Sequence, residues 1–190
     1  MKHEFLILFI ACLLFSCKKQ PIEPKFGYIN TGDTVSENVH YSGKINYLLD
    51  CQDQKSHRTT LHFINLMNNK DSDYIFKSHF QRDNSGFYRE LSIFSNSFDN
   101  HVSVNPNGWV VCHKAGEKMD KNINWDSKDN FYFSRMFCYD DSTFHGTWRN
   151  AYDKYAGIMK IDGLDTIYGW IRLDIYEDSK IMIKDFAYRK

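Results

Sequence analysis

The sequence lacks a net charge, a membrane-spanning apolar run and all but a few prolines, and each absence excludes a class of protein. Lys plus Arg and Asp plus Glu number 24 each, so the chain has no electrostatic reason to bind nucleic acid. The apolar run Phe5 to Phe15 is too short to span a bilayer as a stable helix. Only 3 of the 190 residues are Pro, and no segment has a convincing helical period.

The motifs of common catalytic sites are also missing. There is no CxxC pair for a zinc knuckle or a thioredoxin-type site, no GxSxG elbow and no glycine-rich phosphate loop. No histidines have HxH or HExxH spacing, and six of the eight in the chain are scattered at His57, His62, His79, His101, His113 and His145. Cys112 and His113 are adjacent, so on a strand their side chains point to opposite faces. These patterns predict no catalytic residue.

One stretch has part of the pattern of a calcium loop. Side chains with oxygen ligands recur at Asp120, Asn122, Asn124, Asp126 and Asp129. An EF-hand loop needs Gly at its sixth position and Glu at its twelfth, where this chain has Trp125 and Phe131. A plain turn rich in Asn and Asp is the expected structure, and an irregular Ca²⁺ site is the alternative. The sequence therefore predicts no metal ligand and no cofactor.

The first residues have the pattern of a lipoprotein export signal. Residues 1–16 form a signal peptide, and Leu14-Phe15-Ser16-Cys17 resembles the bacterial lipobox. The resemblance implies cleavage before Cys17 and acylation of this residue, so that several acyl chains anchor the protein to a membrane. An ordinary signal peptide with a chance cysteine is the alternative.

Residues 17–35 are expected to be a lipidated tether between the membrane and the folded domain, because they are polar and contain Pro. No Asp follows Cys17, which favours delivery to the outer membrane. Some surface lipoproteins carry an acidic patch after this cysteine, whereas Lys18 and Lys19 are basic and favour the periplasmic side. The chain is thus predicted to be a cell-envelope protein that contacts a membrane through its N-terminal lipid.

The remainder, residues 36–190, is predicted to be a single β-domain. Its many aromatic residues suit a sheet protein with a sizeable core, since the chain has 12 Tyr and 15 Phe. Strand-like runs separated by turn residues occupy positions 39–49, 59–67, 74–80, 87–94, 101–104, 109–112, 131–139 and 144–148. Residues 114–129 are expected to hold a long loop or one short helix. Regularly spaced short strands predict an all-β, antiparallel β-sandwich-like or barrel-like fold.

The clearest fold signal is a three-strand meander at the C-terminal end. Asp162-Gly163 is the pair favoured in a type I′ hairpin turn, and a turn centred on it would place Lys160 opposite Asp165. The following strand alternates an aliphatic face, which includes Ile167, with a second face, which includes Tyr168 and Trp170. Tyr168 and Trp170 are candidates for an exposed ligand platform, and the alternative is a second packed layer of the sandwich.

The last strand of the meander, Lys180 to Tyr188, changes the parity of its apolar residues. Ile181 and Ile183 share one face, but Phe186 and Tyr188 fall on the other. Either a β-bulge near Asp185 re-aims these rings, or both faces of the sheet are covered.

Residues 146–188 resemble the C-terminal part of a group of secreted or surface β-proteins of Bacteroidetes-type bacteria, which are largely uncharacterised. The resemblance lies in Trp148, Tyr155-Ala156-Gly157, Tyr168-Gly169-Trp170-Ile171-Arg172 and Ile183-Lys184-Asp185-Phe186-Ala187-Tyr188. It implies a secreted β-fold and brings no catalytic residues, since its repeated positions are those of packing and turns.

Three cysteines belong to the predicted domain, namely Cys51, Cys112 and Cys138. The periplasm and the cell surface are oxidising, so one disulfide can form and one thiol must remain. A bond between Cys112 and Cys138 is the preferred pair because both lie on predicted strands. Three buried free cysteines are an equal alternative.

The sequence predicts an envelope lipoprotein that is a non-catalytic binding or structural module, with a glycan or an envelope protein as its partner. The alternative is a glycan-active hydrolase on a β-scaffold. Such a hydrolase needs two carboxylates about 5–9.5 Å apart across a cleft, and nothing in the sequence pairs any two. An acidic cleft would favour the enzyme, and a flat or aromatic-lined sheet would favour binding.

Overall fold

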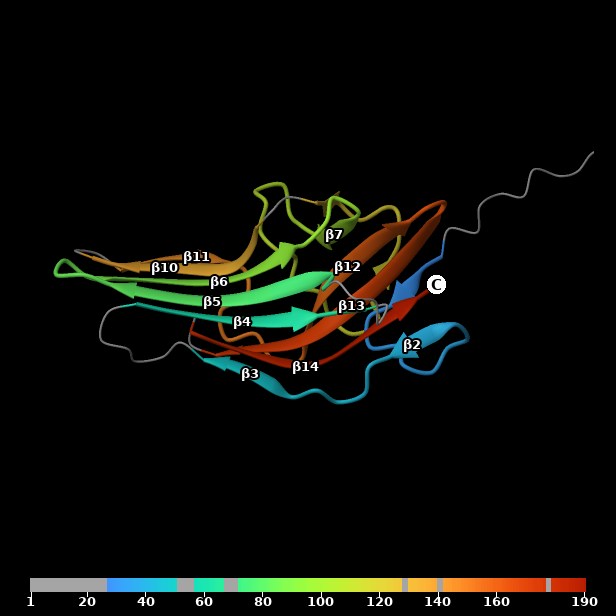
Figure 1. Cartoon of the computed structure of the whole chain (residues 1–190), viewed down its shortest axis with the longest axis horizontal. Coiled ribbons are helices and arrows are strands. Elements are labelled where there is room, and N and C mark those ends of the chain that lie inside the picture. Colours follow the sequence, from blue (N-terminus) through green and yellow to red (C-terminus); the bar gives the residue numbers. More distant parts are fainter. Residues whose placement is uncertain (1–26, 51–56, 67–71, 128–129, 140–141, 177–178) are drawn as a thin grey trace, which may run out of the picture.

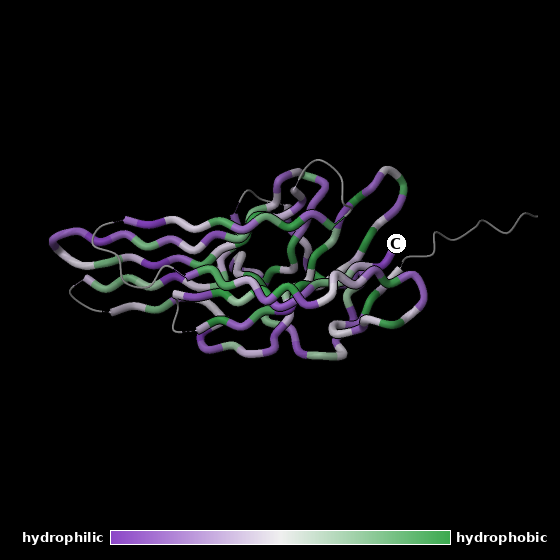
Figure 2. The backbone as a smooth tube through the Cα atoms, turned by 60° about the horizontal axis from the view of Figure 1, so that its bottom comes forward, coloured by the Kyte–Doolittle hydropathy of each residue, from purple (hydrophilic) through white to green (hydrophobic). Residues whose placement is uncertain are grey.

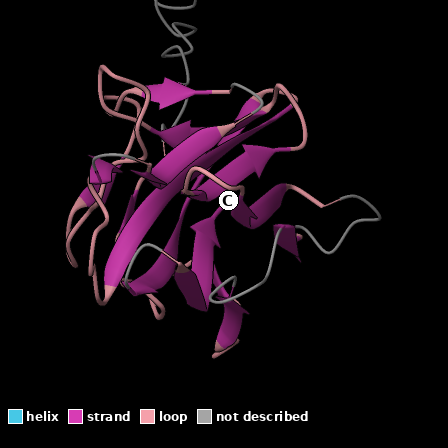
Figure 3. Ribbon diagram, turned by 90° about the vertical axis from the view of Figure 1, so that its left-hand side faces the viewer, coloured by secondary structure: helices cyan, strands magenta, loops and turns pink. Residues whose placement is uncertain are grey.

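Strands and loops make up all of the chain that the computed structural model describes, which is residues 27–50, 57–66, 72–127, 130–139, 142–176 and 179–190 (Figure 3). No helix that could cross a membrane occurs in these residues. The prediction of an all-β, antiparallel sandwich-like fold is confirmed, and the sheets do not close into a barrel.

Two large sheets pack face to face, and a small third sheet lies outside them (Figure 1). The strands are β1 (Ile29–Asn30), β2 (Val39–Tyr41), β3 (Tyr47–Asp50), β4 (His57–Ile64), β5 (Tyr74–Arg82), β6 (Phe87–Ser95), β7 (Asn100–Ser103), β8 (Lys118–Met119), β9 (Trp125–Asp126), β10 (Phe131–Cys138), β11 (Ser142–Gly146), β12 (Lys154–Asp162), β13 (Asp165–Tyr176) and β14 (Lys180–Arg189). One sheet has the order β11-β10-β6-β5-β4, and the other has the order β2-β14-β13-β12-β7-β9, with β3 also paired to β14. β1 pairs with β8.

The main core lies between the two large sheets, where most of the residues are hydrophobic (Figure 2). Strand β5 shows why, because Tyr74, Phe76 and Phe80 point inward and are buried. The residues between them, among them Lys77 and His79, fall on the outer face of the sheet, as the two-residue period of a strand requires.

The seven-stranded sheet is also covered on its other face. Ile29 of β1 and Met119 of β8 pack there against Tyr168, Trp170 and Ala187 and form a second core. The predicted start of the domain at residue 36 is therefore wrong, because β1 and the buried Ile29 already belong to the fold. Cys17, the predicted lipid site, lies outside the described residues.

The C-terminal meander forms as predicted, but its first hairpin has a different register. Asp162 pairs with Asp165, so the two turn residues are Gly163 and Leu164, and Lys160 faces Ile167 in place of the predicted Asp165. Gly163 has a φ of 65° and is the first turn residue, as in a type II′ turn. The predicted register was wrong by two residues, which changes every cross-strand pair but leaves each side chain on its predicted face.

A β-bulge in β14 re-aims its last aromatic residues. Arg172 pairs with Asp185 and Leu173 pairs with Ile183, so Lys184 is the extra residue. Beyond the bulge, Phe186 and Tyr188 pack against the main core with the residues that precede it. Both alternatives for this strand are therefore realised, because the bulge exists and both sheet faces are covered.

Three predicted segments differ in detail. The predicted strand 39–49 is broken into β2 and β3, since Gly43 and Asn46 between them have positive φ. Residues 109–112 form isolated bridges and no strand. The long segment after Lys114 contains the short strands β8 and β9 in place of a helix.

Candidate ligand-binding face

The two residues predicted as an exposed platform are buried. Tyr168 is 2% exposed and Trp170 is 1% exposed, because the small sheet of β1 and β8 covers this face of the seven-stranded sheet. The platform prediction is wrong, and the alternative of a second packed layer is what the structure shows. These rings stabilise the fold and cannot stack on a ligand.

The predicted disulfide is not formed, and Cys112 and Cys138 are free thiols. The backbone near Cys112 meets the start of β10, where Val110 N donates to Tyr132 O at 3.0 Å. Cys138 is the last residue of β10, about 20 Å further along the strand at 3.3 Å per residue. Bonded cysteines need Cα atoms within about 7 Å, so this pair cannot be joined. Cys51 lies outside the described residues.

The Asx-rich segment forms a turn. Asp120 Oδ1 accepts a hydrogen bond from Asn122 N at 2.8 Å, and Asp120 Oδ2 lies 3.0 Å from Lys118 Nζ. Asn124 donates to Val104 O at 3.1 Å, so its amide is committed to the neighbouring strand end. Within the described residues, which include the first four of the five oxygen-bearing residues of the calcium-loop alternative, no three His, Cys, Asp or Glu side chains gather around a metal position.

Ser103, His113 and Glu117 lie in the geometry of a nucleophile triad. His113 Nδ1 is 2.8 Å from Glu117 Oε2, and its Nε2 is 3.0 Å from Ser103 Oγ. Ser103 is fully buried, however, and its Oγ accepts Gly157 N–H at 3.2 Å. A Cβ on Gly157 would lie 2.8 Å from both Ser103 Oγ and Met119 Sδ, so no room remains for a substrate. The arrangement ties the turn after His113 to β7 and β12.

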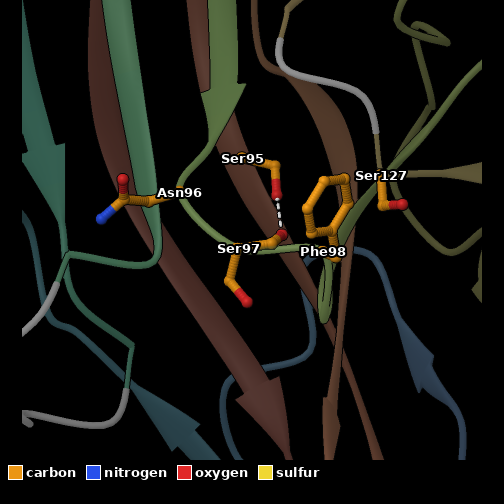
Figure 4. A pocket seen from close by; sticks show the side chains of 5 residues that line it. All are labelled: Ser95, Asn96, Ser97, Phe98 and Ser127. Atoms are coloured by element: carbon orange, nitrogen blue, oxygen red, sulfur yellow. Dashed lines mark hydrogen bonds between the residues drawn. The ribbon is translucent and has the colours of Figure 1, made fainter.

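A small surface pocket lies where β6 ends. It is lined by Ser95, Asn96, Ser97, Phe98 and Ser127 (Figure 4). Ser95 Oγ donates to Ser97 O at 2.5 Å, which closes the turn on itself. The lining includes no carboxylate, imidazole, amine or thiol, so it offers no acid, base or thiol nucleophile.

The outer face of the five-stranded sheet carries a stripe of five ring side chains, one from each strand. They are His57 of β4, His79 of β5, Tyr88 of β6, Phe137 of β10 and His145 of β11. Successive ring centroids lie 4.8, 5.8, 4.9 and 6.2 Å apart. Strands in a sheet are about 4.8 Å apart, so this aromatic stripe crosses the sheet over about 19 Å. The rings form a continuous row. Among the described strands, neither the seven-stranded sheet nor the β1–β8 pair covers this outer face of the five-stranded sheet (Figure 1).

A buried carboxylate lies beside the middle of the aromatic stripe. Glu90 faces His79 on one neighbouring strand and Arg135 on the other. Its carboxylate accepts a hydrogen bond from Lys77 Nζ at 3.1 Å and one from the Tyr88 hydroxyl, and it lies 3.5 Å from Arg135 Nη2. Glu90 thereby holds the Tyr88 ring in place and keeps two cations at the surface.

These contacts set the protonation states along the stripe. Burial by itself raises the pKa of Glu90, but hydrogen bonds from Tyr88 and Lys77 outweigh it and hold this pKa below the ordinary 4.5. Burial lowers the pKa of His79 below 6.5, and the charge of Lys77 acts in the same direction. At pH 7 the site therefore presents a carboxylate flanked by cations and a neutral imidazole, which can both donate and accept hydrogen bonds.

Further apolar groups extend this face at both edges of the sheet. At the β11 edge, Trp109 stacks on His145 with centroids 6.5 Å apart and meets Tyr132 at a tilt with centroids 6.0 Å apart. At the β4 edge, Leu61 and Phe63 are exposed. The face thus combines flat rings with a few fixed polar groups, which is the usual composition of a binding site for a small organic ligand.

Sequence reasoning missed the aromatic stripe. The two-residue period of β5 and β6 places His79 and Tyr88 opposite their apolar neighbours, and this signal can be read locally. The order of the five strands, which brings His57 and His145 to the same face, leaves no local mark. Comparisons with known protein families, curated proteins and solved structures find no match for this chain.

Proposed function

We propose that the chain is a lipid-anchored envelope lipoprotein whose β-domain is a non-catalytic binding module for a glycan. The aromatic stripe carries this proposal. Five rings in contact, beside the fixed charges of Lys77, Glu90 and Arg135, offer stacking surfaces and hydrogen-bond partners to a chain of sugar rings lying across the strands. A periplasmic position at the outer membrane is part of the proposal, on the strength of the lipobox and the basic tether.

A hydrolase on the same scaffold gains no support from the carboxylates. The four buried acids described are Asp73, Glu90, Asp174 and Asp185, and each is paired with a Lys or Arg. A pair of carboxylates that divides acid and base roles needs different environments and access to a substrate. The aromatic stripe, with one carboxylate held between cations, suits binding better.

The ligand prediction is tested on a glycan array with the purified protein, followed by titration of the best ligand. Phe137→Ala is expected to weaken binding about tenfold or more, since an aromatic ring at a binding centre contributes more than about 1 kcal/mol. Tyr152→Ala is the matched control, because Tyr152 is an exposed ring away from the stripe. Failure to bind any glycan, or equal affinities for both variants, would remove the stripe as the binding site.

The anchoring prediction concerns Cys17. Cys17→Ala removes the acylated side chain, so the variant is expected to leave the membrane fraction of fractionated cells, in which the unaltered chain is retained. Cys138→Ala is the control, since it removes a thiol from the domain and leaves the lipobox intact. Retention of the Cys17 variant in the membrane fraction after a carbonate wash would contradict lipid anchoring.

A further inference from the structure

Three apolar side chains at the tips of separate loops are almost entirely exposed. Val35 is 90% exposed, Phe98 is 83% exposed and Leu164 is 104% exposed, and these are the highest values among the exposed large hydrophobic residues of the described chain. They lie in the β1–β2 loop, the β6–β7 turn and the β12–β13 hairpin. Single exposed apolar residues are common, but three on neighbouring loop tips form a surface that needs explaining.

The three loops lie at the same end of the molecule. Ile161 N, next to the hairpin turn, donates to Asp99 O at 2.8 Å and so joins the hairpin to the turn that holds Phe98. The first residue of β2, Val39, pairs with Arg189 at the end of β14, and the following Lys190 reaches Asp162 of the hairpin at 3.3 Å. The β1–β2 loop, which ends just before Val39, is therefore beside the same hairpin.

The chain also enters the fold at this end. Arg189 Nη1 donates to Tyr28 O at 3.2 Å, which places the first described residues beside the end of β14. Nine residues lie between Cys17 and Gly27, and the ten steps from one Cα to the next span at most about 35 Å even when fully extended. A lipid on Cys17 would therefore hold this end of the domain close to the bilayer.

The opposite end of the five-stranded sheet has a different character. The β5–β6 turn there consists of Asp83, Asn84, Ser85 and Gly86, and Asp83 caps it by accepting the backbone N–H of Ser85 at 2.9 Å. Tyr88 of the aromatic stripe lies two residues beyond this turn, whereas Ser95, where β6 ends and the turn with Phe98 begins, lies about 23 Å further along the strand at 3.3 Å per residue. The apolar tips and the stripe thus lie toward opposite ends of the domain.

We propose that the end bearing Val35, Phe98 and Leu164 is a membrane-contacting surface, whose three side chains enter the interfacial layer of the bilayer that holds the lipid anchor. The inference rests on the proposed anchoring at Cys17 and adds a fixed orientation to it. Basic and acidic groups are mixed near the tips, as in Lys190 with Asp162, so a phospholipid surface without net charge suffices. In this orientation the aromatic stripe lies toward the end of the domain that is remote from the membrane, where a glycan can reach it.

The test uses the full chain, processed and lipidated in cells and reconstituted into phosphatidylcholine vesicles that contain radiolabelled phosphatidylcholine. p-Benzoylphenylalanine replaces one residue at a time, as Val35→p-benzoylphenylalanine, Phe98→p-benzoylphenylalanine and Leu164→p-benzoylphenylalanine. Asn84→p-benzoylphenylalanine is the matched control, since Asn84 is also exposed but lies at the opposite end, and the same ketone is introduced. After flotation of the vesicles and irradiation, the label attached to the protein is measured.

The expected result is several-fold more lipid adduct from each of the three tip positions than from position 84. If the protein floats with the vesicles but the three tip positions give no more lipid adduct than position 84, the membrane-contacting surface is overturned and the anchoring stands. Absence of flotation would overturn the anchoring and, with it, this orientation.

Discussion

Replacing Trp148 by Ala is expected to lower the free energy of unfolding by about 3–5 kcal/mol, which is the usual cost of truncating a buried Trp. Trp148 follows β11 in the chain and is fully buried in the main core. Its ring meets Phe133 edge to face with centroids 5.1 Å apart, and its Nε1 donates to Val110 O at 2.9 Å. The substitution leaves a cavity and removes one of the two hydrogen bonds that Val110 O accepts, the other coming from Thr147 Oγ1 at 3.0 Å. Denaturant unfolding followed by circular dichroism measures the loss.

Two further variants separate these contributions. Trp148→Phe keeps most of the packing and loses the hydrogen bond to Val110, so it should cost less than Trp148→Ala. Trp109→Ala removes a Trp that is only partly buried on the outer face of the five-stranded sheet, and a smaller loss is expected. Equal losses for the alanine variants of Trp109 and Trp148 would show that Trp148 does not occupy the core as described.

The C-terminal meander shows which parts of the fold can be predicted from the sequence. Local alternation correctly separated the two faces of β13, because side chains on a strand must alternate whatever they pack against. The hairpin register was wrong by two residues, because Gly163 can occupy either central position of a tight turn without a steric penalty. Each side chain still lies on its predicted face of the sheet, since the shift was an even number of residues.

The candidate site depends on information that is not local. Trp170 was a candidate for an exposed platform because its strand alternates, with a second packed layer as the alternative. β1 and β8, which come from distant parts of the chain, pair with each other and cover it. The aromatic stripe is the opposite case, because it lies on an outer face and was not predicted from the sequence. His57 and His145 are 88 residues apart in the sequence, and only the strand order β11-β10-β6-β5-β4 places them on the same row. The alternation of side chains along a strand predicts which face of the sheet a ring lies on. The pairing of strands decides which residues lie beside the ring and which segment covers it.

The second large effect is expected at an ion pair between the two sheets. Asp73 immediately precedes β5, and its carboxylate pairs with Lys160 Nζ of β12 and accepts Leu66 N at 2.7 Å. The side chains of Asp73 and Lys160 are only 4% and 14% exposed. Asp73→Asn keeps the shape and an oxygen for Leu66 but leaves the Lys160 ammonium without a counter-charge. The expected loss of stability is about 3–5 kcal/mol, as for other buried pairs broken on one side.

A double-mutant cycle distinguishes this charge effect from a packing effect. Lys160→Met removes the ammonium and keeps an unbranched apolar side chain, so adding it to Asp73→Asn should recover part of the stability, with a coupling of roughly 1–3 kcal/mol. Asp162→Asn breaks the exposed pair with Lys190 and should cost only about 0–1 kcal/mol. Strictly additive effects of the Asp73 and Lys160 changes would contradict the pair. Such a result would mean that the sheets are held together at this position by apolar packing alone, and that Lys160, which the hairpin register turns away from Asp165, has no electrostatic role.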